Sequence, residues 1–237
     1  LPAYRKNLVK WISLVSASLI LLLSVIVFFS YDIAAGGYQL IERANWVPAL
    51  GISYYVGIDG IGAPMVLLAG LVMFTGVLVS WGVDDRPREF FSFMMFLGAS
   101  VLGVFCALDL FMLFFFFELA VFPKYLMIVL WGSQKTRNYG GMKLTLYLFI
   151  GSMIALVGAL AIYFGSGLRT FDMIALEGAG FSTDFQRLWF PFVFLGFGIL
   201  SGIFPFHSWA PDGHVAAPTA NSKMLAREEM KVGEYAA

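Results

Sequence analysis

The run LDLFMLFFFFELAVFPKYLMIVLW, residues 108–131, decides the fold class because it is almost continuously apolar. A helix needs about 20 apolar residues to cross the hydrocarbon core of a membrane. Backbone groups find no water there, so a spanning segment is either a helix or part of a closed barrel. The apolar residues of this run are continuous and do not alternate with polar ones, which indicates a helix.

Six further apolar segments give the chain the pattern of a polytopic membrane protein. Hydrophobic residues make up 60% and charged residues 13% of its 237 residues, whereas a soluble chain has about 45–50% and about 25%. We therefore predict an all-α transmembrane bundle of about seven helices, forming a single membrane domain over residues 1–237. The expected segments are 8–29, 60–81, 90–107, 108–131, 144–164, 188–207 and, interrupted by charges, 218–237.

Basic residues in the expected connections predict the orientation. If every segment crosses once, eight basic residues fall on one side and only Arg43, Arg169 and Arg187 on the other. The positive-inside rule places the richer side in the cytoplasm. That richer set is Arg5, Lys6, Lys10, Arg86, Arg88, Lys135, Arg137 and Lys143.

Three connecting regions have an expected structure of their own. Residues 49–58 alternate apolar with other residues, which predicts a short strand or hairpin. Residues 171–176 are expected to form a surface helix. Asp109, at the boundary of two apolar segments, is expected to cap the following helix while facing water.

Glu118 is the first candidate for function because it lies midway along residues 108–131, with no serine or threonine beside it in the sequence. A carboxylate at the centre of a spanning helix costs about 2.5–3.5 kcal/mol on insertion scales. Such a group suits proton transfer, and the alternative is a structural ion pair with a lysine of another helix. Lys124 follows Pro123, where we expect a kink. The lysine is expected to snorkel to the interface or to pair within the bundle.

Lys143 opens the segment 144–164. It can snorkel to the interface, as lysines near helix ends do. Alternatively it points inward and stabilises an ionised Glu118. Both interpretations stay open from the sequence.

The stretch GIFPFHSWAPDGHVAAPTA, residues 202–220, predicts a helix broken near residues 203–212 by Pro205 and Pro211. Broken helices at membrane depth line a cavity or are buried in protein. His207 and His214 can carry protons near neutral pH, and the alternative is a cytoplasmic loop with incidental histidines. Two imidazoles and one carboxylate are too few for a zinc site, so we expect no metal.

Four stretches resemble, in order, the antiporter-like membrane subunits of respiratory complex I (NADH:quinone oxidoreductase, chain M type). The resemblance implies a fold of fourteen helices in two inverted halves, of which this chain covers about one. It also implies a proton pathway through Glu118, the histidines at the broken helix, and Lys231. The four stretches are YYVGIDGIGAPMVLL, GVFCALDLFMLFFFFELAVFPKYLMIVLWG, MKLTLYLFIGS and FPFHSWAPDGHVAAPTA.

Two departures from the family pattern matter for this pathway. The family has a lysine where this chain has Leu200, so the chain either lacks that relay residue or uses another lysine, Lys143 or Lys124, in its place. Residues 221–231, NSKMLAREEMK, are more charged than the apolar helix that the resemblance implies.

The resemblance implies a proton-translocating, non-redox subunit that couples quinone reduction elsewhere to proton transfer. Flavin, iron–sulfur clusters and quinone are expected in partner subunits and none in this chain, which has one cysteine, Cys106, and no glycine-rich dinucleotide fingerprint. The expected partners are other membrane subunits and the lipid bilayer. A net charge of zero argues against nucleic acid. The expected location is a bacterial inner membrane or, alternatively, that of an organelle.

Two other functions remain open. One is a homologous subunit of a multisubunit sodium/proton antiporter or a membrane-bound hydrogenase. The other is a degenerate half-channel that serves only as a scaffold.

Overall fold

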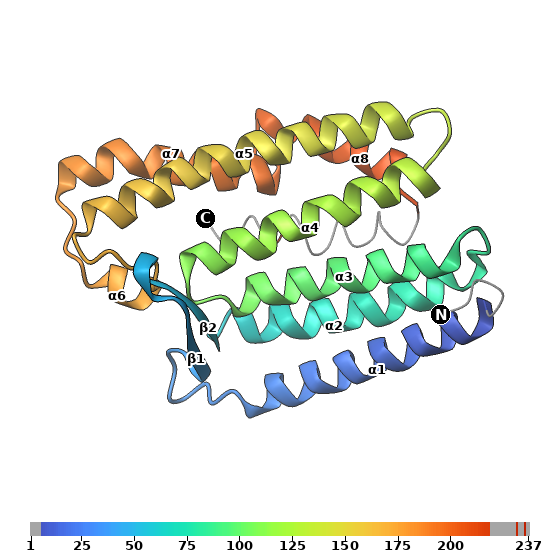
Figure 1. Ribbon diagram of the computed structural model, residues 1–237, viewed down its shortest axis with the longest axis horizontal. Coiled ribbons are helices and arrows are strands. Elements are labelled where there is room, and N and C mark those ends of the chain that lie inside the picture. The colour runs from blue at the N-terminus through green and yellow to red at the C-terminus, as the bar shows by residue number, and fades with distance from the viewer. Residues whose placement is uncertain (1–5, 219–230, 232–234, 236–237) are drawn as a thin grey trace.

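The computed structural model describes residues 6–218, 231 and 235. Its long helices lie side by side in a bundle, with a β-hairpin and a short helix at one end (Figure 1). The elements are α1 (Lys6–Ser30), β1 (Gln39–Val47), a 3₁₀ turn (Pro48–Leu50), β2 (Ile52–Ile58), α2 (Gly62–Val79), a 3₁₀ turn (Ser80–Gly82), α3 (Pro87–Cys106), α4 (Leu110–Trp131), α5 (Arg137–Gly165), α6 (Met173–Glu177), α7 (Thr183–Ser201), a 3₁₀ turn (Phe206–Ser208) and α8 (Trp209–Ala216).

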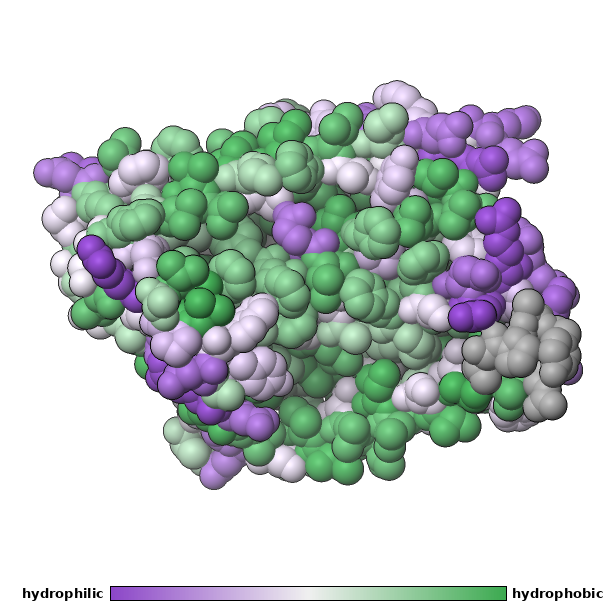
Figure 2. All heavy atoms as spheres, in the orientation of Figure 1, coloured by the Kyte–Doolittle hydropathy of each residue, from purple (hydrophilic) through white to green (hydrophobic). Residues whose placement is uncertain are grey.

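Within the described residues, six segments are long and apolar enough to cross a membrane, with α7 and α8 counted as one. This confirms the predicted helical membrane bundle and its first six segments. The seventh, 218–237, lies almost wholly outside the described residues. Figure 2 shows hydrophobic side chains over the middle of the visible face and hydrophilic ones gathered towards both ends, the distribution that a bilayer requires.

The two ends of the bundle differ in charge and structure. The hairpin and α6 lie at one end, here called the hairpin end, and the start of α1, the α2–α3 turn and the α4–α5 loop lie at the other, here called the basic end (Figure 1). The predicted cytoplasmic set of basic residues, apart from Arg5, which is not described, belongs to the basic end. The two predicted sets of connections therefore lie at opposite ends.

The hairpin is confirmed but begins earlier than residues 49–58. β1 pairs antiparallel with β2, and the chain reverses at Gly51, whose φ of +67° favours glycine. The β1 sequence QLIERANWV lacks a clean alternation, and nearly all of its residues are exposed. Because neither face of β1 is buried, no pattern in the sequence marks this strand.

The helix break is confirmed, but Pro211 does not cause it. α7 ends at Ser201, and Gly202 follows with a left-handed φ of +76°. The backbone oxygen of Ile199 accepts from the N–H of Gly202 at 3.2 Å and from the indole Nε1–H of Trp209 at 2.9 Å, so the side chain of α8 reinforces the end of α7. Pro211 instead lies in the first turn of α8, where proline is tolerated.

Candidate functional site

Glu118 lies at mid-length on α4, but on a face that points out of the bundle. Its side chain is exposed and lines a hollow of about 540 Å³ between α3 and α4. Phenyl rings from both helices form most of the lining, which also includes Ser92 of α3. Within the described part of the chain Glu118 forms no ion pair. The sequence predicted its depth but missed both its outward direction and the hydroxyl that α3 brings near it.

Lys124 lies on the inward side of the same helix. Only 1% of its surface is exposed, among the largest fully buried side chains. α4 continues as one helix through Pro123, and the expected kink there stays a prediction. The interfacial location for Lys124 is therefore wrong, and its place within the bundle is confirmed.

Lys143 pairs with Asp212 and not with Glu118. Its Nζ lies 2.7 Å from Asp212 Oδ2, so the ion pair joins α5 to α8. The two side chains are 20% and 42% exposed, and Gly140 allows the backbone of α8 at Asp212 to approach α5 closely. The proposed support of Glu118 by Lys143 is therefore wrong.

The two histidines of the broken helix have different surroundings. His207 is exposed and stacks on Phe204, with ring centroids 5.7 Å apart. His214 is half-buried in α8, towards the basic end of the bundle. Between them, the Ser208 hydroxyl donates to the hydroxyl of Tyr147 on α5 at 3.3 Å. The break therefore carries several polar groups at the contact of α5 with α8.

Leu200 occupies the position where the resemblance implies a lysine. It is 1% exposed and packs against α5 at Gly151. This part of α7 is thus an apolar contact.

Lys231 lies at the opposite end of the bundle from Lys143. It lines a cavity of about 410 Å³ together with Asp59, Tyr38 and Tyr235. Asp59 precedes α2 at the hairpin end. The structure therefore spreads the six predicted residues along the bundle and does not gather them in one cluster.

Asp109 and Asp172 form a pair of buried carboxylates that sequence reasoning did not connect. Asp109 caps α4, as predicted, but is 0% exposed, so the prediction that it faces water is wrong. Its Oδ2 also accepts from the backbone N–H of Ser53 at 3.0 Å, while Asp172 binds Arg43 at 3.0 Å. Burial raises the pKa of Asp109, although three backbone donors oppose the shift. These contacts fasten the hairpin to α4 and α6.

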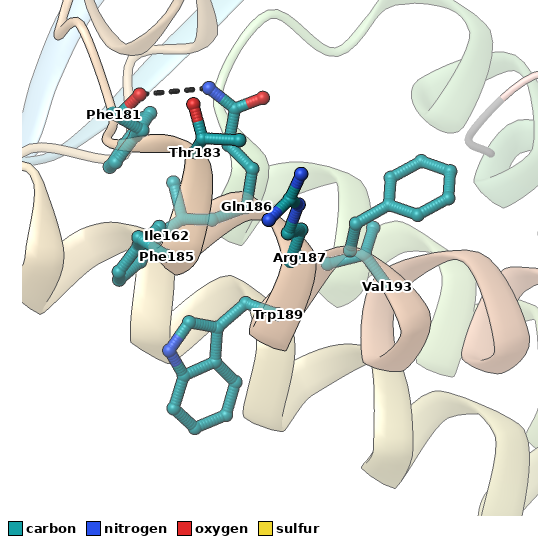
Figure 3. A pocket seen from close by; sticks show the side chains of 9 residues that line it. Ile162, Phe181, Thr183, Phe185, Gln186, Arg187, Trp189 and Val193 are labelled. Carbon is teal, nitrogen blue, oxygen red and sulfur yellow. Dashed lines mark hydrogen bonds between the residues drawn. The ribbon is translucent and has the colours of Figure 1, made fainter.

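A second hollow, at the hairpin end of α5 and α7, lacks groups suited to proton transfer. Figure 3 shows its aromatic and aliphatic lining, with Arg187 as the one charged side chain. Gln186 donates to the Phe181 carbonyl at 2.8 Å. Arginine stays protonated at physiological pH, so this hollow offers apolar contact area and no proton carrier.

No group of three or more potential metal ligands occurs within residues 6–218, 231 and 235.

The sequence pattern of the NADH:quinone oxidoreductase/Mrp antiporter transmembrane family matches residues 107–237. A similar curated protein is NAD(P)H-quinone oxidoreductase chain 4-2 of Synechocystis, which is 39% identical over 96% of this chain and 41% of its own length. Chain 4 of Gloeobacter violaceus is 38% identical over 99% of this chain and 45% of its own length. The chain thus spans less than half the length of these relatives.

Solved structures share the fold. A chain of respiratory complex I from Thermus thermophilus with bound NADH superposes with a TM-score of 0.87 at 28% identity, over 99% of this chain and 50% of that one. A chain of the Mrp complex from Dietzia superposes with a TM-score of 0.79 at 21% identity, over 98% of this chain and 43% of that one. The second likeness shows the fold alone.

Proposed function

The chain belongs to the NADH:quinone oxidoreductase/Mrp antiporter transmembrane family, and from this premise we propose that it is part of a proton-translocating subunit of an NADH:quinone oxidoreductase. Its curated relatives are named as chains of NAD(P)H-quinone oxidoreductases. In this proposal the subunit carries out no redox chemistry. It moves protons in response to quinone reduction in partner subunits, which hold the flavin and the iron–sulfur clusters.

The observation that carries the proposal is the presence of two ionisable residues inside one spanning helix. Glu118 and Lys124 both belong to α4, within an apolar stretch of membrane-spanning length. Charged groups at this depth are costly, and they mark ion or proton pathways more often than packing sites. Lys124 faces the bundle interior and Glu118 faces outward, so α4 presents an ionisable group on each side.

The remaining candidates extend this pair along the bundle. Lys143 and His214 lie towards the basic end, and Lys231 shares its cavity with Asp59 at the hairpin end. His207 lies at the helix break between them. We propose that protons pass along this series, with Lys124 serving in place of the lysine that the resemblance implies at Leu200. The engagement of Lys143 by Asp212 favours Lys124 for that role.

The exposed position of Glu118 supports a neighbouring membrane subunit as a partner. An outward carboxylate in an apolar hollow is unfavourable against lipid, whereas a basic or hydrogen-bonding group of an adjacent subunit would stabilise it. We propose other membrane subunits and the lipid bilayer as partners, and a bacterial cytoplasmic membrane as the location. The positive-inside rule then places the basic end in the cytoplasm.

Replacing Glu118 by Gln tests the proposal, because Gln keeps the shape and removes the titratable proton. The assembled complex, reconstituted in vesicles, should oxidise NADH while translocating fewer protons per electron. Glu42→Gln, at an exposed position of β1, is the matched control and should behave like the wild type. An unchanged ratio of protons to electrons in Glu118→Gln would contradict the proton pathway through this residue and with it the proposed function.

A sodium/proton antiporter subunit is the second candidate, because the family description covers Mrp antiporters. The copurifying subunits distinguish the two, since an antiporter complex lacks an NADH-oxidising arm. Proton movement that depends on a sodium gradient and not on NADH would favour the antiporter. If the chain is a degenerate scaffold, Glu118→Gln should change neither NADH-driven nor sodium-driven proton movement.

A further inference from the structure

The cavity at the hairpin end is polar on one side and apolar on the other. Asp59, Lys231, Tyr38 and Tyr235 supply its polar groups, and side chains of α2, α4 and α6 supply the rest. Its volume of about 410 Å³ exceeds the roughly 10–15 Å³ of probe-occupied volume that one water needs. Two groups of opposite charge and two phenols give water the several polar partners that it requires. The cavity therefore suits a small cluster of water molecules.

Asp59 is the acidic member of this cavity. Its Oδ1 accepts from the backbone N–H of Gly62 at 2.6 Å and from the hydroxyl of Tyr235 at 3.3 Å. No described residue donates to its Oδ2, and the residue is half-buried. One carboxylate oxygen is thus engaged by Gly62 and Tyr235, while the other remains for cavity water.

The two phenols link Asp59 to its surroundings. The hydroxyl of Tyr235 lies between Asp59 Oδ1 and the backbone oxygen of Phe105, 3.4 Å away. Burial, followed by the negative charge of Asp59, raises the pKa of Tyr38, so this phenol keeps its proton. The charged and titratable groups that face Asp59 or its tyrosine neighbours are Lys231, Glu177, Cys106, Tyr38, Tyr55 and Tyr235.

We propose that this cavity is a proton-exchange site through which the chain communicates with the aqueous phase at the hairpin end. The ammonium of Lys231 gives a proton through cavity water to the carboxylate of Asp59, leaving a neutral amine and a carboxylic acid. The acid then gives the proton to external water and returns to the carboxylate, and the amine of Lys231 takes up a proton from the preceding carrier of the series and returns to the ammonium. This inference rests on the proposed proton translocation, and it adds an outlet to the series of carriers.

The first test replaces Asp59 by Asn, which keeps an oxygen for the N–H of Gly62 but cannot carry a proton. A positioned proton carrier contributes about 10²–10⁴-fold, so proton translocation should fall about tenfold or more in the assembled complex. Asp32→Asn is the matched control, because Asp32 also accepts backbone hydrogen bonds at this end but lies outside the cavity. It should translocate like the wild type.

The outcomes separate the outlet from the proposed function. If Asp59→Asn translocates normally while Glu118→Gln does not, the outlet is wrong and the proposed function stands. If Glu118→Gln also translocates normally, the proposed function itself fails.

A second test measures water access and does not depend on Asp59→Asn assembling. Met65 lines the cavity, and Met65→Cys in a Cys106→Ser background provides a single thiol. A membrane-impermeant thiol reagent added on the hairpin side should label this thiol in the variant that keeps Asp59. Absence of labelling from this side would overturn the outlet.

Discussion

Lys143 Nζ lies 2.7 Å from Asp212 Oδ2, and this ion pair connects the start of α5 to α8 beyond the helix break. The two residues are 69 positions apart in the sequence. The contact holds the second half of the broken helix at the basic end, where both side chains remain partly exposed.

We expect Lys143→Met to loosen α8 without unfolding the bundle, because the pair is partly solvated and partly exposed pairs contribute little to global stability. Amide hydrogen exchange in residues 209–216 should become faster, while exchange in α2 and α3 stays the same. Lys135→Met, in the neighbouring loop, is the control. The charge swap Lys143→Asp with Asp212→Lys should restore slow exchange, and equal exchange in all variants would show that the pair does not hold α8.

We expect Arg43→Gln to destabilise the hairpin more than the double variant Arg43→Gln/Asp172→Asn. The single change leaves the buried carboxylate of Asp172 without its cation, which is costlier than removing both charges. Limited proteolysis of residues 39–58 measures the effect. Arg169→Gln, at an exposed position of the same end, is the control, and its hairpin should be cleaved at the wild-type rate. Equal protection of the single and double variants would contradict this account.

Asp109 predicts a pH dependence of the hairpin attachment. Burial raises the pKa of its carboxyl in the folded protein above its ordinary value of 3.8. The folded state then binds the proton more tightly than the unfolded state, so the contribution of Asp109 to stability rises as pH falls through the folded pKa and levels off below about 3.8. The thermal midpoint of Asp109→Asn, measured against pH, should lack the rise that Asp109 contributes at low pH. Midpoints of the wild type and the variant that change in parallel with pH would refute this prediction.

Gly196 and Gly98 offer a matched pair of small-residue contacts. A methyl group at Gly196 would meet the backbone of α5 at Ala155, whereas one at Gly98 would meet the flexible side chain of Met73. Because backbone cannot move aside, Gly196→Ala should cost about 1–3 kcal/mol, and Gly98→Ala should cost less. Thermal midpoints of the two variants in the same detergent measure this order, and a reversed order would contradict the packing argument.

The order of the spanning helices could be predicted because each segment is long and apolar and most are separated by charged or glycine-rich connections. The sequence could not predict whether the side chain of Glu118 points into the bundle or out of it. α4 is apolar on all sides, so its sequence has no polar face that identifies the lipid side or the interior.

The partners of the candidate residues were equally inaccessible to sequence reasoning. Asp212 is far from Lys143 in the chain, and Asp109 is far from Ser53. Such pairs depend on how the helices associate in space, which local patterns do not encode. Glu118 and Lys124 were found because a charge within an apolar run is visible without knowledge of the packing.

The length of α5 has a consequence for the thickness of membrane that the chain fits. Its 29 residues extend about 43 Å at 1.5 Å per residue, whereas the hydrocarbon core is about 30 Å thick. The helix must therefore tilt, or its ends must extend into the headgroup layer. Lys143, the seventh residue of α5, then lies among the headgroups, and a thicker bilayer would draw it and Asp212 into hydrocarbon. The position of Lys143 thus matches the chain to membranes of ordinary thickness.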